Sequence, residues 1–289
     1  MHQRYKMAFS VWTNIDTLVA LNNFEKSSNA LDKSSKLIST GLKISDSKDD
    51  ASNFSIAQGI RGEIKALDAI IRGLNNAKGI AKVALAGATA VSNLFQDIRQ
   101  RVVEGSNPAN TSAQQSLMQN DYSNLLQQMR QFMENSTFND VNILIETNVP
   151  FNTIVGAVND VDVLKDLQGN SLILQGHRLD LSYALLFQED ITTPVNASQT
   201  LDVLLQEERR VQSSLATLGA DYRSLQHQTG YLENLKNVTE IGLGNIIDAD
   251  MARASVEYKA SQVRKELGSE ALNVANQSPQ LLLSLFDNE

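Results

Sequence analysis

Hydrophobic residues recur every three or four positions along most of the chain, the spacing that is typical of one face of an α-helix. After residue 50 this spacing continues without a proline through Ile56, Ile60, Ile64, Leu67, Ile71, Leu74, Ala81, Leu85, Ala88, Phe95, Ile98 and Val102. At about 1.5 Å per residue, a helix of this extent is roughly 75 Å long. That length favours a rod-like bundle over a compact globule.

Turn residues divide the pattern. Asn107-Pro108 predicts a turn, because the residue before a proline leaves the helical region, and a second helix follows from about residue 111 to 133. From Phe138 the pattern changes to short β-like runs, FNDVNILIE, AVNDVDVL and NSLILQGHRLDL, with turn residues between them. Helical spacing returns between Leu201 and Leu235. We therefore predict a small β-containing module over residues 138–197, between long helices.

The two ends of the chain carry narrow hydrophobic stripes. The N-terminal stretch places Phe24, Leu31 and Ile38 at seven-residue intervals. The C-terminal stretch has the steps of three, four and seven that are typical of a coiled-coil seam, through Val256, Ala260, Val263, Leu267, Ala271, Val274, Leu281 and Leu285. A lone helix of this kind is marginal in water, so each stripe needs another helix. The simplest fold turns the chain back on itself and pairs the two ends.

A polar segment, DSKDDAS, precedes the first long helix. Its charged residues, Asp46, Lys48, Asp49 and Asp50, could form a metal or acid–base site, or a corner where one helix ends and the next begins. A calcium loop needs further oxygen ligands at fixed spacing and a terminal bidentate glutamate, which this segment lacks. Acidic and serine side chains satisfy the free N–H groups at a helix start. We therefore favour a hinge and helix start, and expect neither a metal nor a cofactor.

Composition excludes several classes of function. The chain has no cysteine, which removes disulfides, thiolate metal sites and cysteine nucleophiles. Its histidines, His2, His177 and His227, are scattered and form no zinc or hydrolase motif, so we expect no enzyme. The net charge of −8 argues against nucleic-acid binding. Between residues 140 and 190, eight acids against two bases leave a charge of −6, and we expect this region to face solvent.

The terminal stripes could instead lie on a membrane surface. Their polar faces mix acids and bases and lack a basic face with tryptophan anchors, so packing against partner helices is favoured. No apolar run reaches the roughly 18 residues of a membrane span, and we expect no membrane insertion. The start, Met1–Met7, is polar. We expect secretion by a route that does not read a cleaved apolar leader.

Long segments at both ends resemble the terminal signatures of bacterial flagellins. At the N-terminal end these are MAFSVWTNIDTLVALNNF, from Met7, and STGLKISDSKDDASNFSIAQGI, from Ser39. At the C-terminal end the segment is GNIIDADMARASVEYKASQVRKELGSEALNVANQSPQLLLSLF, in which IDAD and NQSPQ are the most specific parts. The likeness covers roughly residues 7–140 and 200–289. Two long signatures in the correct order are a stronger indication than any single short motif.

The resemblance implies a structural subunit that self-assembles into the helical filament used for swimming. It implies that the paired ends form an inner tube as coiled coils, that the long helices form an outer tube, and that the middle of the chain projects outward. The partners it implies are many copies of the same chain, an export chaperone, the flagellar export apparatus, and the filament cap and hook-associated proteins. The location it implies is extracellular.

We accordingly expect a mainly α fold, an elongated antiparallel helical bundle or coiled coil made from paired terminal arms, with a small β-containing central module. Residues 1–6 precede the family start. We assign to the inner tube residues 7–50 and 245–289, and to the outer tube residues 51–137 and 198–244. An exposed acidic module is expected over residues 138–197. The residues expected to become buried on polymerisation, here called the polymerisation seam, are Val11, Leu18, Phe24, Leu31, Ile38, Val263, Leu267, Val274, Leu281 and Leu285.

Other interpretations stay open. Many relatives carry a QRVRELAVQ-like stretch that binds an innate-immune receptor, and here QRVVEGSNP stands in its place; Gly105 and Pro108 interrupt the helix, which argues against that recognition. A hook–filament junction protein shares the general layout, but its relatives usually carry an early motif closer to PSDDP and lack NQSPQ. A flagellin-like surface filament protein with a glycan-binding role is a further alternative, for which the short acidic module offers no evident site.

Overall fold

The computed structural model describes residues 14–146 and 160–286, with side chains described as far as residue 277. In these ranges the chain forms six helices and two short strands. They are α1 (Ile15–Thr40), α2 (Ala51–Gly105), α3 (Ser112–Glu134), β1 (Val161–Leu164), β2 (Ser171–Leu174), α4 (Leu179–Phe187), α5 (Pro194–Ile247) and α6 (Met251–Phe286). The predicted mainly α fold with a small β-containing module is confirmed.

The chain divides into two compact units. One contains the described residues of 1–61 and 239–289, which are α1, α6 and the adjoining ends of α2 and α5. The other contains those of 62–238. The division falls within α2 and α5, whereas the boundaries expected from the sequence lie at the ends of predicted helices. The assignment of residues to inner and outer tubes stays a prediction.

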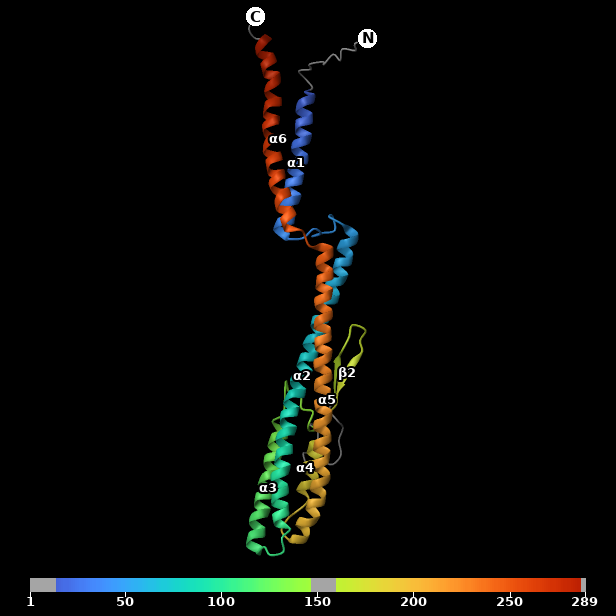
Figure 1. Cartoon of the computed structure of the whole chain (residues 1–289), viewed down its shortest axis with the longest axis vertical. Helices are drawn as coiled ribbons and strands as arrows, with labels where there is room; N and C mark the ends of the chain where they lie inside the picture. The colour runs from blue at the N-terminus through green and yellow to red at the C-terminus, as the bar shows by residue number, and fades with distance from the viewer. Residues whose placement is uncertain (1–13, 147–159, 287–289) are drawn as a thin grey trace. The chain divides into compact units, whose positions relative to one another are not determined.

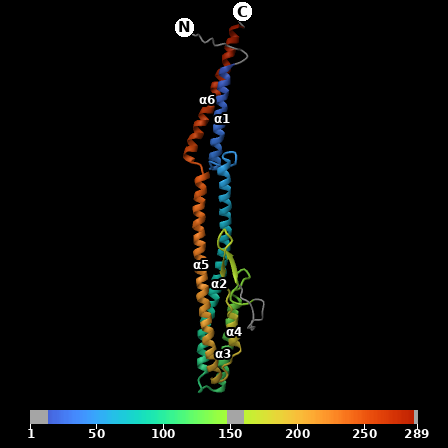
Figure 2. The ribbon, with the colours of Figure 1, turned by 90° about the vertical axis from the view of Figure 1, so that its right-hand side faces the viewer.

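The second unit is a bundle built on α2 and α5, which run side by side within it (Figures 1 and 2). Buried residues of α2 form two rows with seven-residue spacing, the pattern of helices that pack with a coiled-coil-like seam. The first row is Leu67, Leu74, Ala81, Ala88, Phe95 and Val102, and the second is Ile70, Ala77, Ala84, Val91 and Ile98. Burying a large side chain such as Leu or Phe stabilises the fold by about 1.5–3 kcal/mol, so these rows account for much of the bundle's stability.

Helix α5 differs from α2, because only one of its two rows is apolar. Leu204, Val211, Leu218, Leu225 and Leu232 are buried at seven-residue intervals. The neighbouring row, Thr200, Glu207, Ser214, Asp221 and Gln228, is polar. We call it the polar row of α5.

The polar row of α5 holds the central segment in place. Thr200 Oγ1 donates to the carbonyl of Asp190 at 2.8 Å, and Glu207 Oε2 accepts from Ser182 Oγ at 2.6 Å. Asp221 Oδ2 accepts from the N–H of Gln175 at 3.3 Å, and Gln228 Nε2 donates to the carbonyl of Lys165 at 2.6 Å. Four of the five positions therefore bind the segment 165–190 and set its position along the helix.

Helix α3 begins where the sequence predicts a second helix. Thr111 and Gln114 form a reciprocal capping box, which satisfies free N–H groups at the helix start. Tyr122 Oη donates to the carbonyl of Leu186 at 2.6 Å, and burial raises the pKa of this phenol. Helix α2 ends at Gly105, and Pro108 lies in the connection to α3, so the predicted interruption of the QRVVEGSNP stretch is present.

Two glycines of α2 let the segment after α3 approach the helix closely. A Cβ atom at Gly87 would overlap Ser136 Oγ, and one at Gly79 would lie 2.7 Å from the Phe138 ring. Phe138 and Val141 form an isolated bridge around Asn139 and Asp140, whose φ angles of 48° and 61° are left-handed. The predicted β-like run FNDVNILIE is thus a tight turn resting on α2, and no strand forms there because the following residues are buried in the bundle core.

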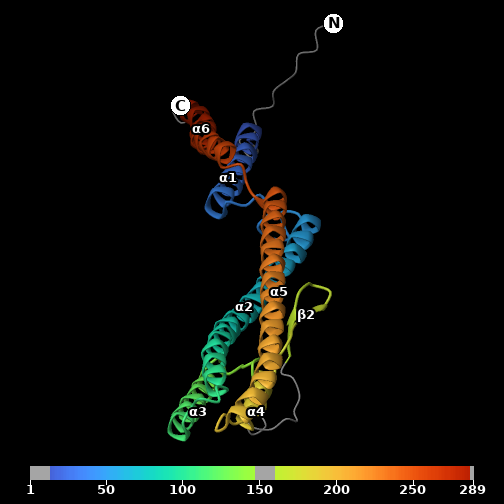
Figure 3. The ribbon, with the colours of Figure 1, turned by 60° about the horizontal axis from the view of Figure 1, so that its bottom comes forward.

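The β-containing module has one hairpin and an unpredicted helix. β1 and β2 pair antiparallel, with Val161 opposite Leu174 and Leu164 opposite Ser171. Figure 3 shows the hairpin beside α5. The segment NSLILQGHRLDL was predicted to carry short β-like runs; SLIL forms β2, but the last residues of the segment begin α4. Helix α4 is apolar on most sides and packs inside the bundle, so its sequence lacks the periodicity that distinguishes a helix from a buried strand.

Candidate functional site

The corner between α1 and α2 is formed by residues 41–50. Helix α1 ends at Gly41, whose φ of 69° is left-handed and whose N–H donates to the carbonyl of Leu37 at 2.9 Å. Glycine adopts this conformation without the steric cost that a Cβ atom imposes. The chain then leaves the helix axis and crosses to α2.

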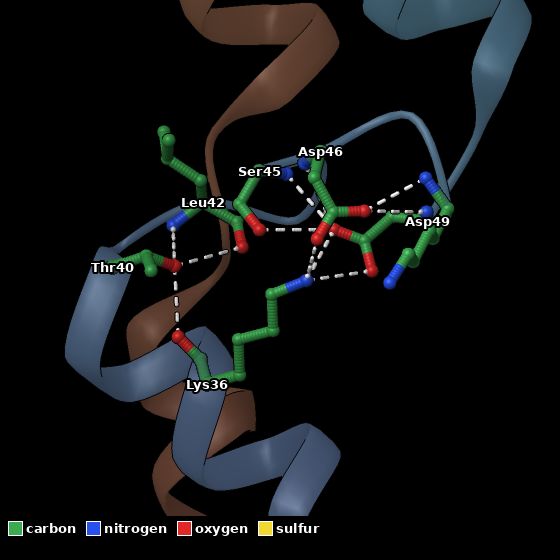
Figure 4. Close-up of polar contacts among 7 residues, drawn as sticks. Lys36, Thr40, Leu42, Ser45, Asp46 and Asp49 are labelled. Atoms are coloured by element: carbon green, nitrogen blue, oxygen red, sulfur yellow. Dashed lines mark hydrogen bonds and ion pairs between the residues drawn. The ribbon is translucent and has the colours of Figure 1, made fainter.

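Asp49 holds the corner from its centre (Figure 4). Its Oδ2 accepts from the N–H and Oγ of Ser45, both at 3.0 Å, and from the N–H of Asp46 at 3.2 Å. Asp46 Oδ1 in turn accepts from the N–H groups of Lys48, at 2.7 Å, and Asp49, at 3.2 Å. The two carboxylates therefore bind the backbone donors of their own turn.

Lys36 joins this turn to α1, and sequence reasoning missed it. Its Nζ lies 2.7 Å from Asp46 Oδ2 and 3.0 Å from Asp49 Oδ2. Lys36 lies just before the last turn of α1, so its side chain can reach the turn that follows the helix. The ten residues between Lys36 and Asp46 form no recognisable motif, so the ion pair itself could not be predicted. The nearest available signal was a lysine close to a helix end and followed by an acidic turn.

Asp50 starts α2. Its Oδ1 accepts from the N–H of Asn53 at 3.0 Å, and its Oδ2 accepts from Asn53 Nδ2 at 2.7 Å. This is the geometry of an N-cap, which satisfies a free donor of the first turn. Of the four charged residues predicted to form the hinge and helix start, three act through their carboxylates, and Lys48 contributes its backbone N–H while its side chain is exposed.

Hydrogen bonds and ion pairs shift the pKa values of the corner residues. The pKa of Asp49 is held below its usual range by the Ser45 donors and by Lys36. Lys36 lowers the pKa of Asp46 in the same way, and the bond from the N–H of Asn53 lowers that of Asp50. The pKa of Lys36 is raised by Asp46 and Asp49. All four groups are stabilised in their charged forms.

A second connection lies against the corner. The N–H of Lys43 donates to the carbonyl of Ile247 at 2.6 Å, and that of Ala249 donates to the carbonyl of Gly41 at 2.9 Å. Ile44, Ala57 and Ile247 form a small buried cluster beneath these bonds. The chain leaving α1 and the chain entering α6 are therefore bound to each other within the first unit.

The charged side chains of the corner hold its backbone in one conformation. Within the described ranges, no cluster of His, Asp or Glu side chains has the arrangement needed to hold a metal ion. The carboxylate oxygens of Asp46 and Asp49 already accept from N–H, O–H and lysine donors. This arrangement fixes a chain direction between two helices.

Helices α1 and α6 lie side by side in the first unit (Figure 1). Three predicted seam residues, Phe24, Leu31 and Ile38, are half-buried on α1. A Cβ atom at Gly268 would lie 3.5 Å from Phe24 Cα, so the two helices approach closely there. Asn14 caps α1 and also donates through Nδ2 to the carbonyl of Ala275 at 3.0 Å.

The side of α6 that packs on α1 is a row of small residues, which sequence reasoning missed. Ala254, Ser261, Gly268 and Ala275 follow at seven-residue intervals and are all buried or half-buried. Val256 and Val263 each lie two residues after a member of this row, which is about 200° around a helix. Apart from the half-buried Leu272, the larger apolar residues in this part of α6 therefore point elsewhere.

Those larger residues are exposed in the single chain. Val256, Val263, Leu267 and Val274 have between 53% and 69% of their surface accessible. Leu18 on α1 is also exposed, together with its neighbours Ile15 and Val19. Of the remaining predicted seam residues, Val11 lies outside the described residues, and Leu281 and Leu285 lie on α6 beyond the described side chains. An apolar surface that is not covered by any of the described residues thus follows α6 and the start of α1.

No described helix combines the length and apolar character required to cross a bilayer. The exposed apolar residues are separated by polar ones and form stripes rather than continuous apolar segments.

Comparison with known proteins gives a match on each side of the central segment. Residues 11–149 match the model of the bacterial flagellin N-terminal helical region, and residues 201–286 match that of the bacterial flagellin C-terminal helical region. Flagellin FljJ of Caulobacter vibrioides is 29% identical over 284 residues, covering 97% of this chain and 99% of the relative. A flagellin of Halalkalibacterium halodurans is 26% identical over 275 residues, covering 94% and 98%.

A solved structure shares the fold. A Vibrio parahaemolyticus protein assigned to the flagellar hook-associated proteins superposes with a TM-score of 0.58 at 13% identity, covering 69% of this chain and 100% of that one. At this identity the likeness concerns the fold alone.

Proposed function

The chain belongs to the bacterial flagellins, the structural subunits of the flagellar filament, and we propose that the exposed apolar stripes of α1 and α6 are the surfaces through which its copies assemble. Membership covers both helical regions that define the family. The chain is accordingly a self-polymerising protein of the extracellular filament.

The observation that carries the proposal is the exposure of Val263, Leu267 and Val274 on a helix that is already paired. Helix α6 contacts α1 largely through small residues, with Leu272 half-buried beside them, and leaves Val263, Leu267 and Val274 exposed for another partner. A fully buried Val or Leu side chain is worth about 1.5–3 kcal/mol. Several such residues on each copy supply the free energy that assembly needs.

Assembly and the ordering of the terminal helices are coupled in this proposal. An α1–α6 pair to which α6 contributes mainly small residues is marginal alone, because helices of this kind depend on packing for their stability. Neighbouring copies supply the missing packing. The contacts join different surfaces of successive copies, so they generate an open helix of subunits rather than a closed ring.

The corner of Lys36, Asp46 and Asp49 is proposed as the hinge between the inner-tube and outer-tube parts of the subunit. It combines a short connection between two helices with charged groups that hold one chain direction. The polymerisation seam, including Leu281 and Leu285, and the tube assignment of the expected domains are parts of the same proposal.

We propose further partners by membership of the family. They are an export chaperone, the flagellar export apparatus, the filament cap and the hook-associated proteins. The role is structural, and we propose no catalytic activity. A hook–filament junction role has weaker support, because the relatives that match almost the whole chain are flagellins.

Electron microscopy of the purified chain under polymerising conditions tests the proposal. We expect uniform hollow tubes from the full chain. Variants that lack about forty residues at either end are expected to stay soluble, helical and unassembled, because each stripe loses its partner helix. Normal tubes from either truncated variant would contradict the proposal.

A further inference from the structure

The outward face of the β hairpin carries two large apolar side chains. Leu164 and Ile173 are 53% and 52% exposed, while Val163 and Leu174 on the inward face are buried. The turn residue Leu167 is exposed as well. Large apolar side chains exposed together on a two-stranded hairpin mark a surface that can pack against another molecule.

The apolar face has an acidic rim. Between residues 160 and 170, Asp160, Asp162 and Asp166 face one base, Lys165, which leaves two negative charges. Asp160 and Asp166 accept backbone N–H groups, from Gly176 at 2.8 Å and Asn170 at 3.0 Å, so they are fixed at the rim. Asp162 lies on the outward face of β1, opposite Ile173.

A groove of about 720 Å³ lies on a different side of α5. Its lining includes Lys78 from α2 and Arg223, His227, Gly230, Tyr231 and Glu233 from α5. A side chain at Gly230 would extend into open space, so the groove is open at this point. Tyr231 is exposed and offers an aromatic surface, and Lys78 and Arg223 against Glu233 leave one positive charge.

The hairpin and the groove cannot meet within one chain. The hairpin is bound to the side of α5 that carries Asp221 and Gln228. Arg223 and Gly230 each lie two residues further along the helix, which turns them about 200° away. A contact between the two surfaces therefore requires a second copy, and it joins unlike surfaces, the kind of contact that continues without closing.

We propose that the hairpin of one copy docks in the α5 groove of the next, with Leu164 and Ile173 against Tyr231 and the acidic rim beside Lys78 and Arg223. The occupant is a second copy because the acidic rim and the positively charged groove complement each other in charge, and Tyr231 offers an aromatic surface to Leu164 and Ile173. The inference rests on the proposed self-assembly and deepens it by naming a lateral contact in the second unit, apart from the terminal helices.

The absence of cysteine from the chain makes a direct test possible. Asp162→Cys is combined with Arg223→Cys, tubes are assembled, and oxidation is followed on a non-reducing gel. The matched control combines Asp162→Cys with Arg209→Cys, which replaces an exposed arginine of α5 fourteen residues earlier on the same side, about 21 Å away.

We expect covalent multimers from the pair 162/223 and monomers from the pair 162/209 and from each single variant. Tubes that give no cross-link at 162/223, or equal cross-linking at 162/209, would overturn the docking contact while leaving self-assembly intact. Absence of tubes from the unaltered chain would overturn the proposed function, and this contact with it.

Charge exchange gives an independent readout. Arg223→Glu places like charges together and is expected to raise the critical concentration for assembly about two- to five-fold, the range of an exposed ion pair. Adding Asp162→Lys to Arg223→Glu is expected to restore the original value. If the double variant assembles no better than Arg223→Glu alone, the two surfaces do not meet.

Discussion

A single lysine connects one helix of this protein to the turn that follows it. Lys36 Nζ contacts both Asp46 and Asp49, and each of these carboxylates also binds backbone N–H groups of the turn. Without the lysine, two neighbouring negative charges would be held together only by backbone N–H donors and the Ser45 hydroxyl. We therefore expect the order of the corner to depend on Lys36 more than on any other side chain outside the turn.

Replacement of Lys36 tests this dependence. Lys36→Met keeps the length of the side chain and removes its charge, so the pKa values of Asp46 and Asp49 should rise towards their usual range. Amide exchange in residues 45–49 should become faster, because Asp49 binds the N–H groups of Ser45 and Asp46 more weakly. The control is Lys33→Met, on an exposed position three residues earlier. Unchanged amide exchange in Lys36→Met would show that the turn is ordered without the lysine.

The pKa shifts of the corner also set its pH range. Asp46, Asp49 and Asp50 have lowered pKa values, so their contribution is complete above the unfolded value of about 3.9 and is lost as the pH falls through the folded values. Lys36 has a raised pKa, so its contribution is complete below about 10.4 and is lost as the pH rises through the folded value. Carboxyl carbon shifts of these aspartates should be constant from about pH 5 to 9; titration of any of them within this range would contradict the assignment.

A buried carboxylate in α5 gives a prediction on stability. Glu207 is 3% exposed, and it is held by Ser182 Oγ at 2.6 Å and by Arg210 at 3.0 Å. Ser182→Ala should lower the free energy of unfolding by about 1–3 kcal/mol, because a buried charged acceptor loses a donor. Ser224→Ala, on the exposed side of α5, should change it by less than about 0.5 kcal/mol. Urea unfolding followed by circular dichroism measures both; equal midpoints would mean that Arg210 alone satisfies Glu207.

At the scale of helices and strands, long periodic segments were predictable and contacts across the fold were not. The hydrophobic spacing between Ile56 and Val102 predicted α2 because that helix buries one face and exposes the other. Helix α4 was missed because it is buried on most sides and carries no such alternation. Gly242 and Gly244 lie inside the continuous helix α5, where the packing of neighbouring residues outweighs the low helix propensity of glycine.

The candidate site likewise contains some features that the sequence could predict and others that it could not. The helix start at Asp50 and the end of α1 at Gly41 follow from local chemistry, since caps are formed by residues adjacent in sequence. The pairing of Lys36 with Asp46 and Asp49, and the small-residue row of α6, depend on how the chain turns in space. A search for large apolar residues passes over alanine, serine and glycine, although these residues decide which side of α6 faces α1.

Gly268 offers a test of that small-residue row. Gly268→Ala adds only a Cβ atom, which would lie 3.5 Å from Phe24 Cα at ordinary contact distance, and should stabilise α6 by up to about 1 kcal/mol. Gly268→Leu cannot be accommodated at this distance and should separate the helices, with faster amide exchange in α1 and α6. Equal protection of α1 in the two variants would show that α6 does not pack through Gly268.

At the scale of the whole molecule, the two faces of α6 have different tasks. One face completes the subunit through small residues, and the other leaves Val256, Val263, Leu267 and Val274 exposed. A monomer that buried these larger residues itself would have little reason to assemble. The same division separates changes that damage the subunit from changes that damage only the assembly.

Leu267→Asp places a charge on the exposed face and should abolish tube formation while leaving the helical circular dichroism of the subunit unchanged. The physical reason is that an unpaired carboxylate is costly to bury between copies, yet costs little on a residue that is 66% exposed in the single chain. Asn273→Asp is the matched control, because it adds the same charge at an exposed polar position of α6, about 120° around the helix from Leu267, and should assemble normally. Sedimentation and electron microscopy distinguish the outcomes. Intact tubes from Leu267→Asp would remove this residue from the seam, and loss of helicity would mean that Leu267 supports the subunit itself.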